Sequence, residues 1–207
     1  MFASFALQQV APIGSDAGTV RTDHVTFSMT SGFAGEYLTC LSFLILLLAV
    51  TLLGRLLRGT AEVSEWLASS AAAAGVVYVA VTLAGALANL GAALYIGHHG
   101  GDLSTVAALV DAHWFAVFSA TAVLGVFTGC IAGAVLVSRA LPRWVAWTGF
   151  VTAVVCVASV PAAGAGAVDT ATLVWVLWFV GLGVAGLRGG SRTTAAGVPS
   201  APTPVSV

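Results

Sequence analysis

Residues 43–53 read FLILLLAVTLL, and the apolar run to which they belong extends from Phe33 to Leu53 and on towards Leu57. No charged residue falls between Glu36 and Arg55. A transmembrane helix needs about 20 consecutive, predominantly apolar residues. This run therefore predicts a membrane-spanning helix, and it sets the class of the whole chain.

Four further apolar runs follow, separated by short segments rich in charge, Gly or Pro: residues 66–97, 104–137, 144–161 and 170–187. The expected fold is an all-α bundle of five transmembrane helices within residues 33–188. Residues 1–32 are expected to form an exposed N-terminal arm. Residues 189–207 are rich in Gly, Ser, Thr and Pro without periodicity, which predicts a disordered tail.

The composition agrees with a membrane protein, because 59% of the 207 residues are hydrophobic and only 7% are charged. A soluble domain carries about 25% charged residues. The expected partner is therefore the lipid bilayer, and a net charge of −1 gives no basic excess that would favour nucleic acid. All seven cations are Arg, and Ala, Val and Gly are abundant, which is typical of GC-rich bacterial genomes and points to a multi-pass protein of a bacterial inner membrane.

The Arg residues predict how the chain crosses the membrane. Six of the seven fall in pairs after the first, third and fifth apolar runs: Arg55 and Arg58, Arg139 and Arg143, Arg188 and Arg192. Short segments rich in Arg stay on the cytoplasmic side. The expected topology is N-outside and C-inside, with residues 98–102 and 161–169 on the outer side and a cytoplasmic tail.

A glycine stripe, Gly125, Gly129 and Gly133, repeats every four residues in the third run. At about 100° per residue these positions share one narrow face, where small residues let helices approach closely. The stripe predicts a helix–helix contact, either within the chain or between two copies. Asp111 projects onto the same face, whereas His113 points nearly the opposite way.

Titratable residues gather at the predicted outer edge of the bundle. The candidate metal ligands are His98, His99, Asp111 and His113, since imidazole and carboxylate suit zinc and related ions. Their spacing fits no standard metal motif, and the favoured interpretation is that they are polar residues at helix ends, where water is present. A haem would have His98 or His99 with His113 as its only ligand pair. No cofactor and no catalytic residue are predicted.

Three further side chains have structural interpretations. Ser104 is expected to cap the third helix. Asn89 lies within the second run and is expected to donate a hydrogen bond to a neighbouring helix. Trp114, with Trp66, Trp144 and Trp147, is expected to anchor a helix end at the membrane surface.

The segment SRALPRWVAWTGF, residues 138–150, has a basic turn followed by Leu-Pro-Arg-Trp and a Trp-x-Gly that enters the next helix. It resembles uncharacterised bacterial integral membrane proteins of the domain-of-unknown-function class, and the order of elements from Glu36 to about Val160 is similar too. Such proteins typically have six helices, and this chain lacks an apolar run before residue 33. The resemblance implies a fold class but no activity.

The expected role is that of an integral membrane protein of unknown process. It is a non-enzymatic helical bundle that either belongs to a complex or binds a small molecule. Two alternatives remain open. One is a metal- or haem-dependent membrane enzyme or redox protein that uses the outer His/Asp residues, and the other is a small permease for an uncharged solute.

Overall fold

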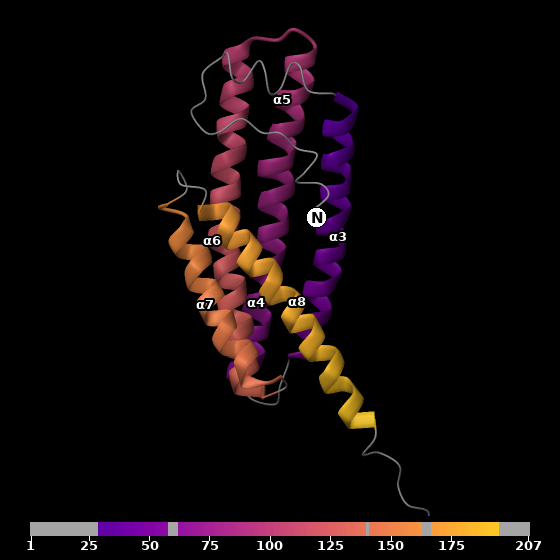
Figure 1. Cartoon of the computed structure of the whole chain (residues 1–207), viewed down its shortest axis with the longest axis vertical. Helices are drawn as coiled ribbons and strands as arrows, with labels where there is room; N and C mark the ends of the chain where they lie inside the picture. The colour runs from indigo at the N-terminus through magenta and orange to yellow at the C-terminus, as the bar shows by residue number, and fades with distance from the viewer. Residues whose placement is uncertain (1–28, 58–61, 140, 163–166, 195–207) are drawn as a thin grey trace, which may run out of the picture.

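The structure, a computed structural model, describes residues 29–57, 62–139, 141–162 and 167–194. Within these ranges the chain is all-α, with helices that run alternately up and down the bundle (Figure 1). In chain order the elements are α3 (Met29–Leu56), α4 (Glu62–Val81), the π-helical turn η1 (Thr82–Leu87), α5 (Ala88–His98), α6 (Leu103–Ser138), α7 (Arg143–Ser159) and α8 (Ala167–Thr194). The elements α4, η1 and α5 form one continuous helix.

Four of these helices are long and apolar enough to cross a membrane. They contain Gly32–Leu53, Glu62–His98, Leu103–Ser138 and Ala167–Leu187. The fifth, α7, is apolar but has only 17 residues. The described part of the chain is therefore that of a multi-pass membrane protein, as the composition predicts.

The helix boundaries differ from the predicted ones mainly at the two ends of the chain. Helix α3 begins at Met29, inside the segment expected to be an exposed arm, and α8 continues to Thr194, inside the segment expected to be a disordered tail. The rest of that arm, residues 1–28, and of that tail, residues 195–207, lie outside the described residues.

Helix α6 is the centre of the bundle. It packs along α4, η1 and α5 on one side and along α7 on another, and its large side chains Leu124, Phe127 and Ile131 are almost fully buried. Helix α7 in turn packs against α8, where the Trp178 indole N–H donates to the Val145 carbonyl at 3.1 Å. By contrast α3 rests on α4, η1 and α5, and it has almost no direct contact with α8.

The glycine stripe of α6 contacts other helices of the same chain, which is one of the two alternatives predicted from the sequence. A Cβ atom at Gly125 would lie 2.7 Å from Val157 Cγ2 and 3.0 Å from the Ala153 carbonyl oxygen, both on α7. Gly129 also faces Ala153, at 3.7 Å, whereas Gly133 faces Leu67 of α4. One stripe therefore holds two neighbouring helices close to α6.

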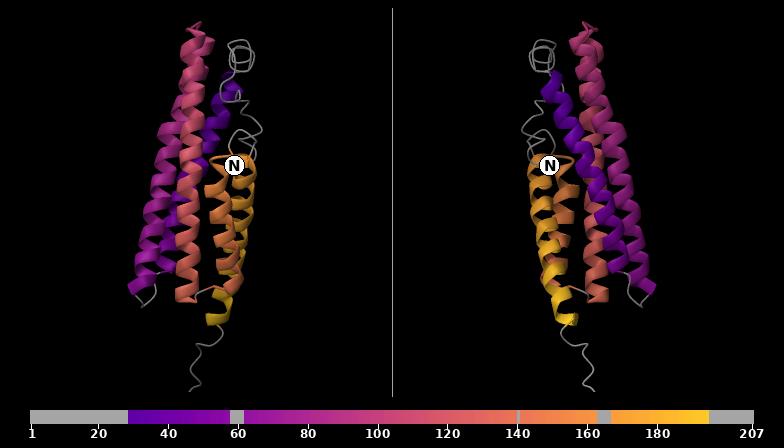
Figure 2. Two further views of the ribbon diagram at one scale, coloured as in Figure 1. Left: turned by 90° about the vertical axis from the view of Figure 1, so that its left-hand side faces the viewer. Right: turned by 90° about the vertical axis from the view of Figure 1, so that its right-hand side faces the viewer.

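The helices differ in length, so some of them extend further along the bundle than others. At about 1.5 Å per residue, the 37 residues of Glu62–His98 extend about 55 Å, and the 17 residues of α7 about 25 Å. Helices α7 and α8 therefore accompany α6 over only part of its length, and α3, α5 and α6 continue beyond them (Figures 1 and 2).

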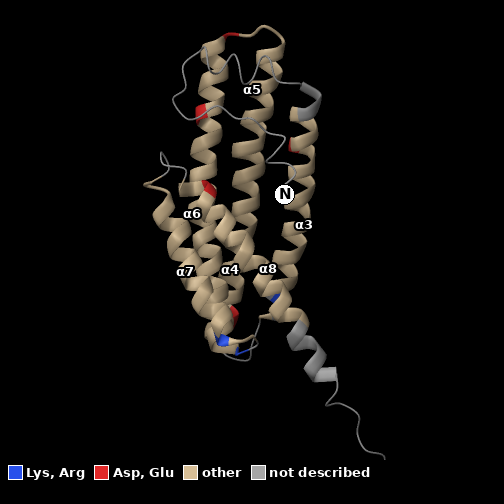
Figure 3. Ribbon diagram, viewed as in Figure 1, with Lys and Arg blue, Asp and Glu red and all other residues tan. Residues whose placement is uncertain are grey.

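Charged side chains are few, and the described Arg residues are confined to one end of the bundle (Figure 3). Among the described residues, the Arg side chains lie at the end of the bundle where α3 and α6 end and α7 begins. Acidic side chains occur at both ends, with Asp102 in the turn between α5 and α6, and also between the ends, at Glu36, Asp111 and Asp169. Most of the remaining exposed side chains along the bundle are apolar.

Asp102, not the predicted Ser104, caps α6. The Asp102 carboxylate accepts from the Thr105 backbone N–H at 3.3 Å and from the Ser104 hydroxyl. These hydrogen bonds, led by that from Ser104, hold the pKa of Asp102 below its usual 3.8. Ser104 thus supports the cap, and it does so through the aspartate.

Candidate functional site

The structure does not bring the four predicted metal ligands together. His98 is half-buried at the end of α5, and His99 is exposed, with its ring stacked on Tyr95 at a centroid distance of 4.2 Å. Asp111 and His113 lie on α6, where Asp111 is half-buried and His113 is buried. Within the described ranges, no three His, Cys, Asp or Glu side chains are grouped so that they could hold a metal ion. The metal site stays a prediction.

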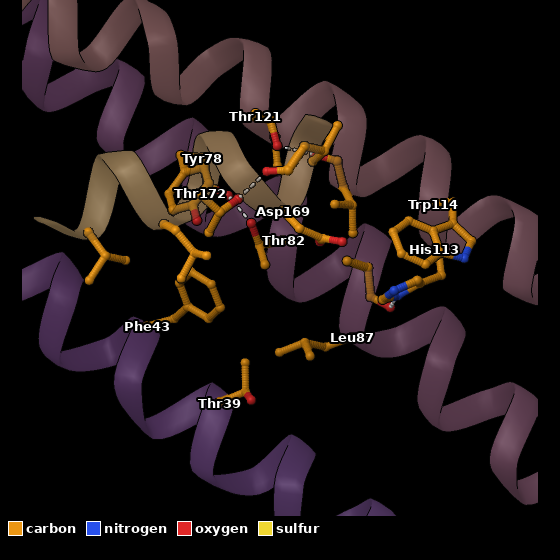
Figure 4. A pocket seen from close by; sticks show the side chains of 16 residues that line it. Thr39, Phe43, Tyr78, Thr82, Leu87, His113, Trp114, Thr121, Asp169 and Thr172 are labelled. Atoms are coloured by element: carbon orange, nitrogen blue, oxygen red, sulfur yellow. Dashed lines mark hydrogen bonds between the residues drawn. The ribbon is translucent and has the colours of Figure 1, made fainter. Parts of the chain in front are cut away.

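A cavity of about 400 Å³ lies instead in the middle of the bundle, between α3, α4–η1, α6 and α8 (Figure 4). Most of its lining is apolar, and it includes Phe43, Leu87, Ala120, Leu173 and Val176. The polar side chains that face it are Thr39, Tyr78, Thr82, His113, Trp114, Thr121, Asp169 and Thr172. A mainly apolar hollow with a few converging polar groups is the usual form of a small-molecule site.

The π-helical turn η1 forms one wall of this cavity. In this turn a backbone hydrogen bond spans five residues instead of the usual four: the Ala88 N–H donates to the Leu83 carbonyl. The widened turn leaves carbonyl groups that side chains can reach, and π-bulges of this kind occur frequently at functional sites. Asn89 Nδ2 donates to the Gly85 carbonyl at 2.5 Å. The expected hydrogen bond from Asn89 to a neighbouring helix is therefore wrong, because η1 offers an acceptor in its own helix.

His113 is fixed by the same turn. Its Nδ1 lies 2.8 Å from the Ala86 carbonyl oxygen. A carbonyl only accepts hydrogen bonds, so Nδ1 carries the proton in this contact, and in the neutral ring Nε2 is then an acceptor. The ring also packs edge-on against Trp114, at a centroid distance of 5.5 Å. His113 is thus a positioned side chain of the cavity wall, and Trp114 beside it lines the cavity in addition to any anchoring role.

The threonines of the lining all use their hydroxyl hydrogens within their own helices. Each donates to the carbonyl four residues earlier, at 2.8–2.9 Å: Thr39 to Gly35, Thr82 to Tyr78, Thr121 to Val117 and Thr172 to Val168. A hydroxyl that has donated its hydrogen still has oxygen lone pairs. The threonines therefore present acceptors to the cavity.

Asp169 is the acidic residue of the site. It lies in the first turn of α8 and is exposed at the edge of the cavity. In the view of Figure 4 its carboxyl group lies between Thr82 and the His113 ring. None of the described lining residues is Arg or Lys, so the formal charge of the lining is negative when His113 is neutral.

A second, smaller cavity of about 270 Å³ continues along the seam between α3 and α8. It shares Phe43 and Val176 with the first cavity, and its lining is almost wholly apolar, with Leu46, Ala49 and Phe179 among the members. Trp175 also lines it, and the indole N–H of Trp175 is buried without a hydrogen-bond partner in the described part of the chain. The two cavities adjoin along this seam between α3 and α8, and the polar side chains are all but confined to the first cavity.

Sequence reasoning missed this site, although some signals were present. Thr39, Thr82, Thr121 and Thr172 lie in four different apolar runs, each of which holds other polar residues too, so none of the four stands out by itself. What joins them is the tertiary packing: α3 packs on α4, while α8, which packs mainly on α7, lines the same space. Of the predicted site residues, only His113 belongs to the cavity.

Comparisons of the chain with known protein families, with curated proteins and with solved structures found no match. The resemblance at residues 138–150 therefore stays a prediction. What the protein does must follow from the chemistry of the cavity itself.

Proposed function

We propose that this chain is a non-enzymatic, multi-pass membrane protein that binds a small, mainly apolar molecule in the cavity between α3, α4–η1, α6 and α8. The observation that carries this proposal is the cavity itself. A volume of about 400 Å³ falls in the usual range of ligand pockets, and the lining combines apolar walls with a few oriented polar groups. A bundle whose only task is to hold other helices would gain packing energy by filling such a space.

A binding role fits the polar groups better than a catalytic role. The hydroxyls of the lining threonines donate to backbone carbonyls, and His113 Nδ1 is bound to the Ala86 carbonyl. Among the described lining residues, no hydroxyl or thiol is hydrogen-bonded to a base, which is the arrangement that activates a nucleophile. These contacts fix the lining side chains and leave the threonine oxygens and His113 Nε2 as acceptors for a ligand.

The proposal includes a position in the membrane. The Arg pairs at or near the C-terminal ends of α3, α6 and α8 favour a cytoplasmic location for those three ends, in a bacterial inner membrane. The turn between α5 and α6 would then be outside. The cavity would then open towards the outer side of the membrane, because its lining includes Asp169 in the first turn of α8, the helix end opposite to the Arg pair.

A photoreactive probe tests the binding proposal. Decanol with a diazirine on its chain is added to the protein in lipid nanodiscs, and the labelled peptides are identified by mass spectrometry. We expect competable labelling of α6 and α8 residues that line the cavity. Thr172→Phe fills the cavity and should remove most of this labelling.

The matched control is Thr148→Phe. Thr148 is also a helical threonine bonded to the carbonyl four residues earlier, at 2.8 Å, but it is exposed on α7 and away from the cavity. Labelling of the cavity should be unchanged in this variant, and both variants should keep the helical circular dichroism of the parent. Equal labelling in parent and Thr172→Phe, or labelling confined to lipid-facing positions, would overturn the proposal.

A further inference from the structure

The cavity has a polar end and continues into an apolar one, and this restricts the class of molecule that can bind. We infer that its ligand is an amphiphile from the bilayer whose polar end donates hydrogen bonds or carries positive charge, and whose apolar chain lies in the seam between α3 and α8. This inference rests on the proposed function and adds to it the chemistry of the ligand and its route of entry.

The first step is the hydrogen-bonding sense of the lining. Thr82, Thr121 and Thr172 present oxygen lone pairs, since their hydrogens are used on backbone carbonyls. The Tyr78 hydroxyl, which also lines the cavity, can donate as well as accept a hydrogen bond. The neutral His113 ring offers Nε2 as an acceptor. The polar end of the cavity is therefore rich in acceptors.

The second step is charge. Asp169 adds a carboxylate at the edge of the cavity, and no described lining residue is Arg or Lys. The N-terminus of α8 acts in the opposite sense, because a helix end of this kind is equivalent to about +0.5 charge. The full negative charge of Asp169 lies in that same first turn and exceeds the helix contribution. A cationic or neutral donor group is thus favoured over an anion.

The third step is the shape of the seam. The polar end lies at the first turn of α8, and the apolar second cavity begins at Trp175 and continues to Val180, further along the same helix. From Asp169 to Val180 the helix rises about 16 Å, which leads from the edge of the bilayer into its hydrocarbon region. A molecule with one polar end and an apolar chain matches this gradient.

The fourth step is access. Helices α3 and α8 have almost no direct contact, and the space between them is lined by side chains such as Phe43, Leu46 and Phe179. Exposed apolar residues of both helices, among them Ile45 on α3 and Leu177 on α8, face the lipid. An amphiphile can therefore enter sideways from the bilayer without passing through water.

Three probes that differ only in the polar group test this inference: decylammonium, decanol and decanoate, each with the same diazirine on the chain. Labelling of cavity peptides is measured against probe concentration in nanodiscs of neutral lipid. We expect decylammonium to label half-maximally at about fivefold lower concentration than decanol, which is the size of effect that an exposed ion pair supplies. Decanoate should be the weakest of the three.

Asp169→Asn should remove the advantage of decylammonium over decanol, measured as the ratio of the two half-maximal concentrations within the same variant. Glu65→Gln is the matched control, since Glu65 is an exposed acid at the other end of the bundle, and it should change nothing. An advantage of decylammonium that survives in Asp169→Asn would overturn the role of Asp169.

The outcomes separate the two proposals. If no probe labels the cavity, the proposed binding function fails. If all three label it and decanoate labels at the same or lower concentration than decylammonium, the binding function stands and the inferred ligand class is wrong. With the diazirine near the far end of the decyl chain, labels should fall around Phe179 in the seam; labels confined to the first turn of α8 would contradict the inferred path of the chain.

Discussion

Single glycines decide how closely α6 and α7 approach. We expect Gly125→Ala to destabilise the protein by about 1–3 kcal/mol, the usual cost of overpacking, because the new methyl group would lie 2.7 Å from Val157 and 3.0 Å from a backbone oxygen. Gly129→Ala is the matched control, since its methyl group would lie 3.7 Å from Ala153, an ordinary contact. Thermal unfolding of the two variants in one detergent measures the difference. Equal midpoints would contradict the packing described here.

At this scale the sequence predicts the glycine stripe but not its partners. Spacing alone shows that Gly125, Gly129 and Gly133 share a face, and that face does approach other helices. The division of the stripe between α7 and α4 depends on the crossing of three helices, which no local pattern records. The contacts of Asn89 and His113 depend on η1, and one extra residue in a helical turn leaves no mark in the hydrophobic pattern.

Helix ends are the part of each element that the sequence predicts least well. The apolar runs predict the five helices, and the structure confirms them as helical segments. Apolar character, however, does not say where a helix stops, because both a spanning helix and its extension into water keep the same backbone bonds. Helix α8 continues through a Gly-rich segment to Thr194, and α6 begins one residue before the predicted cap, with Asp102 in that role.

The cap of α6 can be tested separately from the bundle. Asp102→Ala removes the side-chain acceptor of the Thr105 N–H, leaving only the Asp102 carbonyl at 3.1 Å, and should speed hydrogen exchange in the first turn of α6. Asp102→Asn should retain protection because an amide oxygen also caps helices. Hydrogen exchange followed by mass spectrometry measures both variants. If Asn and Ala exchange equally fast, the carboxylate contact is not what orders this turn.

The pH dependence of this cap has a definite sign. Folding lowers the pKa of Asp102 below 3.8, so the ionised carboxylate is the form that the folded turn favours. The stabilising contribution is complete above the pKa of the unfolded chain and is lost as the pH falls through the lower, folded value. Near neutral pH the cap is therefore insensitive to pH.

At the scale of the whole molecule, the position of the C-terminus tests the proposed topology. With five spanning helices and the Arg pairs inside, a reporter fused after residue 207 should be active only if it is one that works in the cytoplasm. The same reporter inserted between Pro161 and Ala162, in the turn after α7, should report the opposite side. A periplasmic signal from the C-terminal fusion would show that α7, with 17 residues, does not span.

The whole molecule also shows why the cavity escaped sequence analysis. Each helix was predicted from its own run of residues, whereas the cavity arises from a space that four helices leave between them. The candidate site drawn from the sequence collected titratable residues by their nearness along the chain. The structure instead joins Thr39, Thr82, Thr121 and Asp169, which are far apart in sequence, at one level of the bundle.

The unequal helix lengths have a consequence for the lipids themselves. A hydrocarbon layer about 30 Å thick is longer than α7, at about 25 Å, and much shorter than the helix from Glu62 to His98. In a bilayer that covers both helices, hydrophobic mismatch would have opposite signs on two sides of one molecule: lipids would be compressed beside α7, and the longer helix would either stretch them or extend into water. A change in bilayer thickness would then reduce the mismatch beside one helix and increase it beside the other.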